Sequence, residues 1–154
     1  LPRSSDKEDG WTDLMATVKW LDLLGSPYKL HGTGSDGFDC SSLAEAVLLR
    51  MGRTVPPTSP FRAMTGANPA KEIDTYFEAM AAAYDKVGAR LRMANQVGDL
   101  VLTANENGMP IGLYVLVEPN RGTFLTAHKT SGVVSVRRFA IKNVVGIYRV
   151  KDNA

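Results

Sequence analysis

The residues of this chain best suited to nucleophilic or metal chemistry are one cysteine, Cys40, and two histidines, His31 and His128. Cys40 directly follows Asp39 at the expected start of a helix, where unpaired backbone amides and the helix dipole favour a thiolate. A thiolate nucleophile also needs an imidazole within hydrogen-bonding reach. The alternative is a structural cysteine, because a lone cysteine is among the most buried residue types. Position alone leaves both interpretations open.

Spacing argues against two other kinds of site. The cysteine and the two histidines are too scattered for a zinc motif, so we predict no metal site and no cofactor. Three glycines within residues 32–37 match the spacing of a dinucleotide-binding loop, but no βαβ alternation surrounds them. We therefore interpret these glycines as a tight turn, and His31 as a loop histidine partly in water.

The elements that must position Cys40 follow from the pattern of apolar and turn residues. Apolar residues spaced three or four apart predict helices over residues 11–24, 40–51 and 70–87. Asp39 is the expected cap of the second helix. Five strands joined by short turns are predicted over residues 99–103, 111–117, 123–128, 133–139 and 144–150. This order indicates an α+β fold, with N-terminal helices packed on a C-terminal antiparallel sheet of about five strands.

The composition is typical of a single folded domain and excludes several classes of function. The 154 residues, 44% of them hydrophobic, suffice for a single core. The formal net charge of +2 is too small for a nucleic-acid footprint, and no apolar run is long enough for a membrane span or a signal peptide. We predict one domain over residues 11–150 between tails at 1–10 and 151–154, without nucleic-acid binding or membrane insertion.

Several short segments follow one another in a characteristic order. They are Gly25-Ser26-Pro27-Tyr28, Gly37-Phe38-Asp39-Cys40-Ser41, Val97-Gly98-Asp99-Leu100, Ile111-Gly112-Leu113-Tyr114 and Gly146-Ile147-Tyr148. Together they resemble the NlpC/P60 cysteine peptidases over roughly residues 11 to 150. The resemblance implies a papain-like fold in which a helix carrying the nucleophile packs on an antiparallel sheet carrying the base. It also implies that Cys40 is the nucleophile.

The same resemblance suggests residues of a substrate pocket. Tyr28 and Asp39 match pocket positions of the family, and Ser41 would be a second donor at the helix terminus. Simpler roles exist for two of them, since Asp39 can serve only as a helix cap and Tyr28 can simply pack its ring on the sheet. We predict Tyr28, Asp39 and Ser41 as the substrate-binding residues.

The chain departs from the family pattern at the catalytic base. The family's histidine directly precedes the Ile111-Gly112 segment, and here that position is Pro110, which has no titratable group. The family's third polar residue corresponds to Thr126. His128 lies two residues further along the same strand and on the same face, which makes it the remaining candidate base. Those two residues span about 6 to 7 Å, more than a thiolate–imidazole pair absorbs without a bulge or a register change.

We therefore predict a cysteine endopeptidase-like domain for peptidoglycan stem peptides, with Cys40 and His128 as candidate catalytic residues and an active site impaired at Pro110. The alternative is a pseudoenzyme that serves as a structural or wall-binding component of a phage tail or similar virion, with other tail proteins as partners. A third possibility, an intracellular amidase or acyltransferase on the same fold, needs the same imidazole. The expected location is the bacterial cell envelope or the virion.

Overall fold

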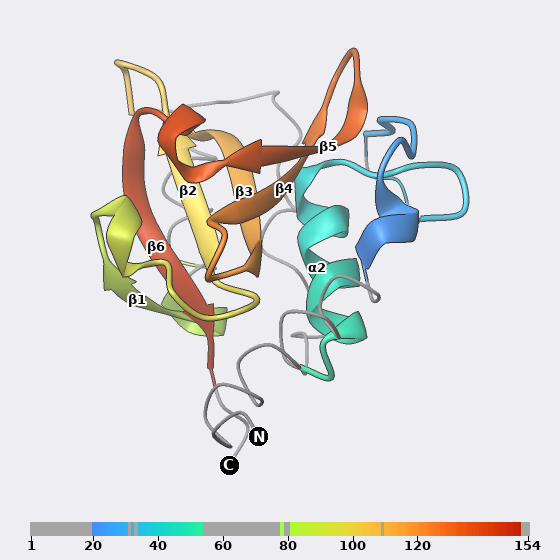
Figure 1. The fold of residues 1–154 in the computed structure, drawn as a ribbon. Coiled ribbons are helices and arrows are strands. Elements are labelled where there is room, and N and C mark those ends of the chain that lie inside the picture. The colour runs from blue at the N-terminus through green and yellow to red at the C-terminus, as the bar shows by residue number, and fades with distance from the viewer. Residues whose placement is uncertain are drawn as a thin grey trace, which may run out of the picture.

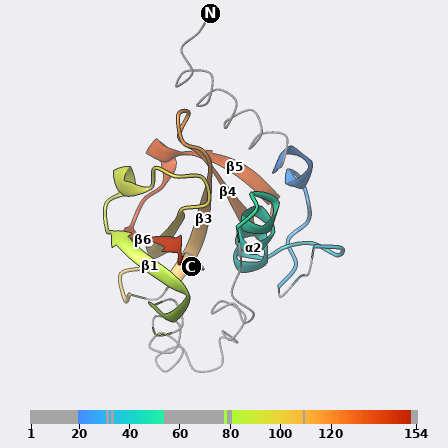
Figure 2. The same ribbon diagram turned by 90° about the horizontal axis from the view of Figure 1, so that it is seen from below.

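The computed structural model describes residues 20–30, 32, 34–53, 78, 81–108 and 110–151. Within them, the helix α2 (Cys40–Arg50) lies beside a six-stranded sheet, as Figures 1 and 2 show from two sides. The strands are β1 (Tyr84–Gly88), β2 (Leu100–Ala104), β3 (Pro110–Glu118), β4 (Thr123–His128), β5 (Gly132–Arg137) and β6 (Val144–Val150). All neighbouring strands are antiparallel, in the order β1-β6-β2-β3-β4-β5. The predicted α+β fold is confirmed.

The predicted sheet lacked one strand. Residues 84–87 were expected to end a helix over residues 70–87, but Tyr84–Gly88 forms β1 and pairs with β6, beginning at Tyr84 opposite Val150. A run of about four residues before a glycine is too short for periodicity to separate helix from strand, and the open edge of β6 decides the outcome. Most of the predicted helix over 70–87, and residues 11–19 of the first helix, lie outside the described residues.

Short 3₁₀ helices occupy three connections, and one of them shortens a predicted strand. They are η1 (Leu21–Leu23), η3 (Leu91–Met93) and η4 (Arg138–Ala140). The strand predicted over residues 133–139 ends at Arg137, because the chain turns into η4 and bonds the amide of Arg138 to the carbonyl of Gly122.

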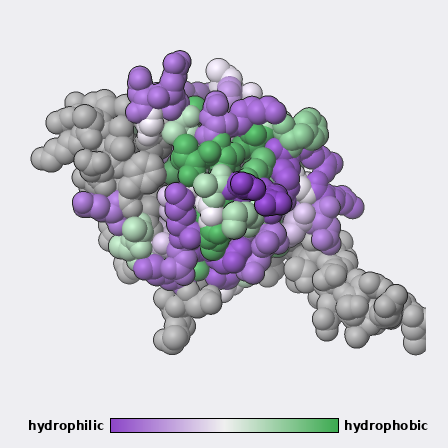
Figure 3. Space-filling model, turned by 90° about the vertical axis from the view of Figure 1, so that its left-hand side faces the viewer, coloured by the Kyte–Doolittle hydropathy of each residue, from purple (hydrophilic) through white to green (hydrophobic). Residues whose placement is uncertain are grey.

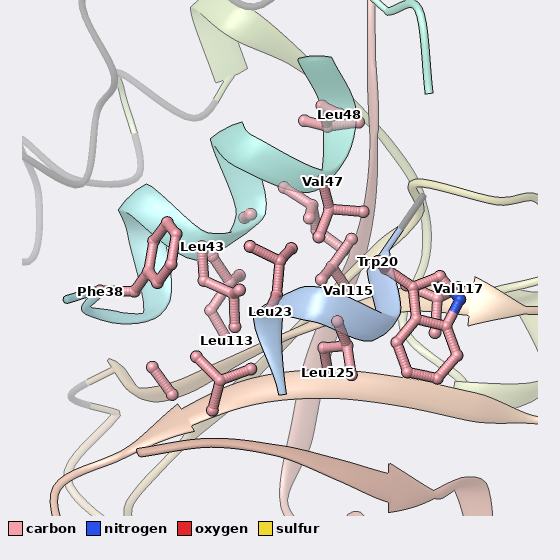
Figure 4. Packing of buried hydrophobic residues seen from close by; sticks show 14 of the residues in the cluster. Trp20, Leu23, Phe38, Leu43, Val47, Leu48, Leu113, Val115, Val117 and Leu125 are labelled. Carbon is pink, nitrogen blue, oxygen red and sulfur yellow. The ribbon is translucent and has the colours of Figure 1, made fainter. Parts of the chain in front are cut away.

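Apolar side chains cover both faces of the sheet and fix α2 on one of them. On that face Leu43, Val47 and Leu48 of α2 belong to one cluster with side chains of β3 and β4, as Figure 4 shows. Because side chains alternate along a strand, the smaller cluster, which includes Leu116 and Phe124, lies on the opposite face. Burial of one side of α2 therefore holds its N-terminus, with Cys40, against β3 and β4.

The turn before β2 is anchored by a buried carboxylate. Asp99 accepts hydrogen bonds from the amides of Asn95 and Gln96, both at 3.0 Å, and from Nε and Nη2 of Arg149 in β6, both at 2.8 Å. Gly98, at a φ of +93°, allows the same turn to approach α2, since a Cβ there would lie 2.9 Å from Cδ2 of Leu48. The Gly98-Asp99 pair thus joins the turn to both β6 and α2.

Candidate active site

Cys40 is the first residue of α2, and its neighbours hold the start of this helix. Asp39 has an extended backbone, and its carboxylate accepts hydrogen bonds from the Ser42 amide at 2.8 Å and the Ser41 hydroxyl at 2.6 Å. The Ser42 hydroxyl in turn accepts a bond from the Asp39 amide at 3.0 Å. The capping role predicted for Asp39 is confirmed, and the hydroxyl of Ser41 is directed at Asp39.

The glycine segment before α2 folds back on itself and carries Tyr28. Tyr28 and Phe38 form an isolated parallel bridge, in which the Phe38 amide donates to the carbonyl of Pro27 at 3.0 Å. A Cβ at Gly37 would lie 2.5 Å from that same carbonyl oxygen, so a side chain at this position would collide with the backbone. The structure agrees with the tight turn expected for these glycines, and His31 lies outside the described residues.

The sulfur of Cys40 contacts β4. Its thiol donates to the carbonyl oxygen of Ala127 at 3.3 Å, and its Sγ lies 3.7 Å from Oγ1 of Thr126. Thr126 is the position that the resemblance assigned to the third polar residue of the site. Within the described part of the chain, these are the hydrogen-bond partners of the sulfur.

These contacts form where β3 and β4 separate. The two strands pair from Glu118 opposite Thr123 to Val115 opposite Leu125, and beyond that point β4 continues to pair with β5. In place of a further ladder bond between the strands, the Thr126 hydroxyl donates to the carbonyl of Leu113 at 2.9 Å. Cys40 occupies this opening and satisfies the carbonyl of Ala127.

Counting protons shows what this arrangement does for the sulfur. A threonine hydroxyl has one proton, and that of Thr126 is committed to Leu113, so towards Sγ the hydroxyl can only accept. The Ala127 carbonyl is also an acceptor. The single S–H proton of Cys40 is directed at Ala127, so the 3.7 Å approach to Thr126 carries no proton of its own, and neither neighbour supplies a donor to a thiolate.

The two positions considered for the base lie at strand ends. His128 is exposed at the end of β4, and its Nδ1 is 2.9 Å from Oγ1 of Thr130 and 3.3 Å from the Thr130 amide. These bonds tie its ring to the turn that follows β4, and the structure shows no hydrogen bond between His128 and Cys40. Pro110 is the first residue of β3, opposite Ala104, a position where the missing amide proton of proline is tolerated.

Two tyrosines lie in the electrostatic range of the Cys40 sulfur. Burial raises the pKa of Tyr114, and the negative charge of an ionised Cys40 would raise it further. Burial likewise raises the pKa of Tyr28, with added contributions from Cys40 and Asp39. Tyr114 was not among the predicted site residues, although it stands in a segment that carries the family resemblance and alternates with Leu113 along β3. The structure therefore brings Tyr28, Asp39 and Ser41 close to Cys40 and adds Thr126, while the ring of Tyr114 packs against the cluster that includes Leu116 and Phe124.

Two further observations concern other kinds of site. In the described part of the chain, no three His, Cys, Asp or Glu side chains gather as metal ligands. No helix in that part combines the length and the apolar character needed to cross a bilayer.

The fold and the site define a class of α+β proteins in which a cysteine begins a helix packed on an antiparallel sheet. The model of the NlpC/P60 family matches residues 25–145, and the chain belongs to this family. No curated protein sequence matches the chain.

Solved structures share this fold at low sequence identity. The NlpC/P60 domain of the peptidoglycan hydrolase SagA is 15% identical, with a TM-score of 0.53 over 90% of this chain and 98% of that one. A lipoprotein-like NLP/P60 protein of Staphylococcus aureus is 20% identical, with a TM-score of 0.55 over 93% of this chain. An NlpC/P60 protein of Bacillus cereus is also 20% identical, with a TM-score of 0.55 over 90% of this chain. The chain spans 42% and 40% of the latter two proteins.

Proposed function

We propose that this chain is a peptidoglycan-directed NlpC/P60 domain that binds stem peptides at the Cys40 site and cleaves them poorly or not at all. Membership of the family supports the substrate class, as does a fold shared with a domain of a peptidoglycan hydrolase. The impaired cleavage is a separate claim that depends on the contacts of the thiol.

The environment of the sulfur is the observation that carries this claim. A cysteine peptidase needs an imidazole that takes the thiol proton and later gives it to the leaving amine. Here the family's base position is Pro110, and the thiol donates instead to the carbonyl of Ala127. The remaining partner, Thr126, has already donated its proton to Leu113. These contacts support a thiol that is held as a hydrogen-bond donor and is not activated.

Features expected of peptide recognition are nevertheless present around the thiol. Tyr28 is partly buried and packs against the same cluster as Cys40, so it offers an aromatic surface on which a peptide can pack. Asp39 is committed to the start of α2, so we assign it the task of holding the helix terminus that carries Cys40. No contact or surface of the described residues favours the phage-tail alternative over this function.

The test is mass spectrometry of muropeptides incubated with the native chain and with its Cys40→Ala variant. We expect no cysteine-dependent release of fragments, while a control NlpC/P60 peptidase cleaves the same sample. A muropeptide titration followed by NMR should show saturable binding, which Tyr28→Ala weakens. Fragment release that disappears in Cys40→Ala would refute the impaired site, and separate His31→Gln and His128→Gln variants would then identify the base.

A gain-of-function variant makes this test stronger. The double variant P110H/T126H restores imidazoles at the two positions where the family pattern has polar residues, while Cys40 and the aromatic side chains stay in place. We expect cysteine-dependent cleavage in this variant and none in the native chain. If P110H/T126H binds muropeptides and still fails to cleave them, the missing imidazole is not the cause of inactivity.

A further inference from the structure

A hollow lies on the sheet face opposite α2 and shares no residue with the Cys40 site. Its volume is about 630 Å³, and it is formed by η3, by the turn between β3 and β4, and by η4 with the residues that follow it. Figure 3 shows the side of the molecule that is on the left in Figure 1, where an apolar area is ringed by hydrophilic side chains. The lining residues are Leu91, Pro119, Asn120, Arg121, Gly122, Arg138, Phe139, Ile141 and Lys142.

The apolar part of the hollow includes an aromatic ring that is largely exposed to solvent. Phe139 in η4 is 79% exposed, although phenylalanine gains most from burial of its ring. A single exposed apolar side chain is ordinary on a protein surface, but Phe139 stands beside Leu91, Pro119 and Ile141 in one concave site. The ring is therefore placed where a bound group could cover it.

The walls of the hollow are held in place by arginines. Nη1 of Arg138 donates to the carbonyls of Leu91 at 2.7 Å and Ala94 at 2.9 Å, and its guanidinium lies 5.2 Å from the centre of the Phe124 ring. Nη1 of Arg137 donates to the carbonyl of Arg121 at 3.0 Å, which braces the turn between β3 and β4. These bonds connect η4 to η3 and the end of β5 to the turn, so little ordering is needed when a ligand binds.

The charge of the hollow is positive. Arg121, Arg138 and Lys142 line it, and its lining contains no acidic residue. The neighbouring carboxylate of Glu118 lies 3.7 Å from Nη1 of Arg121 and offsets one of these charges, while the Arg121 side chain stays 69% exposed. A ligand with carboxylates would complement this charge.

We propose that this hollow docks an acidic protein segment that carries an aliphatic or aromatic side chain between its carboxylates. The apolar side chain would fill the space beside Leu91 and Ile141 against Phe139, and the carboxylates would pair with Arg121 and Lys142. A flat anionic membrane fits less well because Phe139 is the one strongly exposed side chain of the apolar lining, while Ile141 is buried at 5% exposure. A polyphosphate chain fits less well because it would leave Phe139 uncovered.

The probe is a synthetic ten-residue peptide with two central leucines and three carboxylates on each side. It is titrated into the isotopically labelled full chain and followed by NMR. We expect saturable shifts at the hollow and none at Cys40. The variant R121E/K142E should bind about tenfold more weakly or worse, because two attractive charges become repulsive. F139S should also weaken binding.

Matched variants and probes distinguish specific binding at this hollow from non-specific binding. K86E/K151E reverses two exposed charges elsewhere, and L49S removes an exposed apolar residue of α2, so both should bind the probe as the native chain does. A probe with glycines in place of its leucines should bind more weakly. The proposal is overturned if the first probe does not saturate, if the control variants lose as much binding, or if phosphatidylglycerol vesicles or polyphosphate bind in its place at the same residues.

Discussion

Asparagine in place of Asp99 keeps the shape of the side chain and removes the charge that Arg149 pairs with. The Asp99 side chain is 1% exposed and that of Arg149 is 26% exposed, with two hydrogen bonds of 2.8 Å between them. Removing one partner of a buried ion pair typically costs about 3 to 5 kcal/mol. The amide oxygen of asparagine can still accept from the turn, and Arg149 has some access to water, so we expect the free energy of unfolding to fall by about 3 kcal/mol.

Chemical denaturation at pH 7 measures this loss, and Asp22→Asn provides the matched control. Asp22 pairs with Arg50 on the surface, where ion pairs contribute little, so its replacement should leave the denaturation midpoint nearly unchanged. A double variant D99N/R149M should recover part of the loss, because no buried charge is then left unpaired. If Asp99→Asn destabilises no more than Asp22→Asn, the anchoring role given to Asp99 is wrong.

Three further predictions concern two glycines, the hydroxyl of Thr126 and the raised pKa of Tyr114. Gly37→Ala should lower the free energy of unfolding by about 2 kcal/mol or more, and Gly25→Ala, which has open space around it, by about 1 kcal/mol, as urea denaturation can compare. Thr126→Val should cost about 1 to 2 kcal/mol by leaving a β3 carbonyl without its donor. The alkylation rate of Cys40 should barely change in that variant, and a severalfold change would mean that the hydroxyl donates to the sulfur. The raised pKa of Tyr114 means that the folded chain binds this proton more tightly than the unfolded chain, so Tm should fall as pH rises above the ordinary tyrosine value of 10.0, and less so in Tyr114→Phe.

The parts of the fold that were predicted correctly are those with clear local end signals. The helix α2 has Asp39 as its cap and Gly52 beyond its end, and both signals are visible in the sequence. The strands over residues 123–128 and 144–150 have their predicted bounds, since turn residues flank them. The strand β1 was missed because its formation depends on pairing with β6, which is far away in the chain.

The candidate site was predicted only in part, for a related reason. The sequence indicated Cys40, Tyr28 and Asp39. Because side chains alternate along a strand, it also predicted that His128 lies on the same face as Thr126. Alternation does not reveal where two strands separate. The partners of the thiol depend on the separation of the two strands after Leu125 in β4 and before Val115 in β3.

Because β3 and β4 separate at this point, Cys40 has a structural role that does not depend on peptide cleavage. Its S–H group saturates a carbonyl that the sheet itself leaves without a ladder partner, so Cys40 takes part in the framework of the fold. Random mutation followed by selection for folding alone would then disfavour alanine at this position and tolerate serine, which can donate a similar bond.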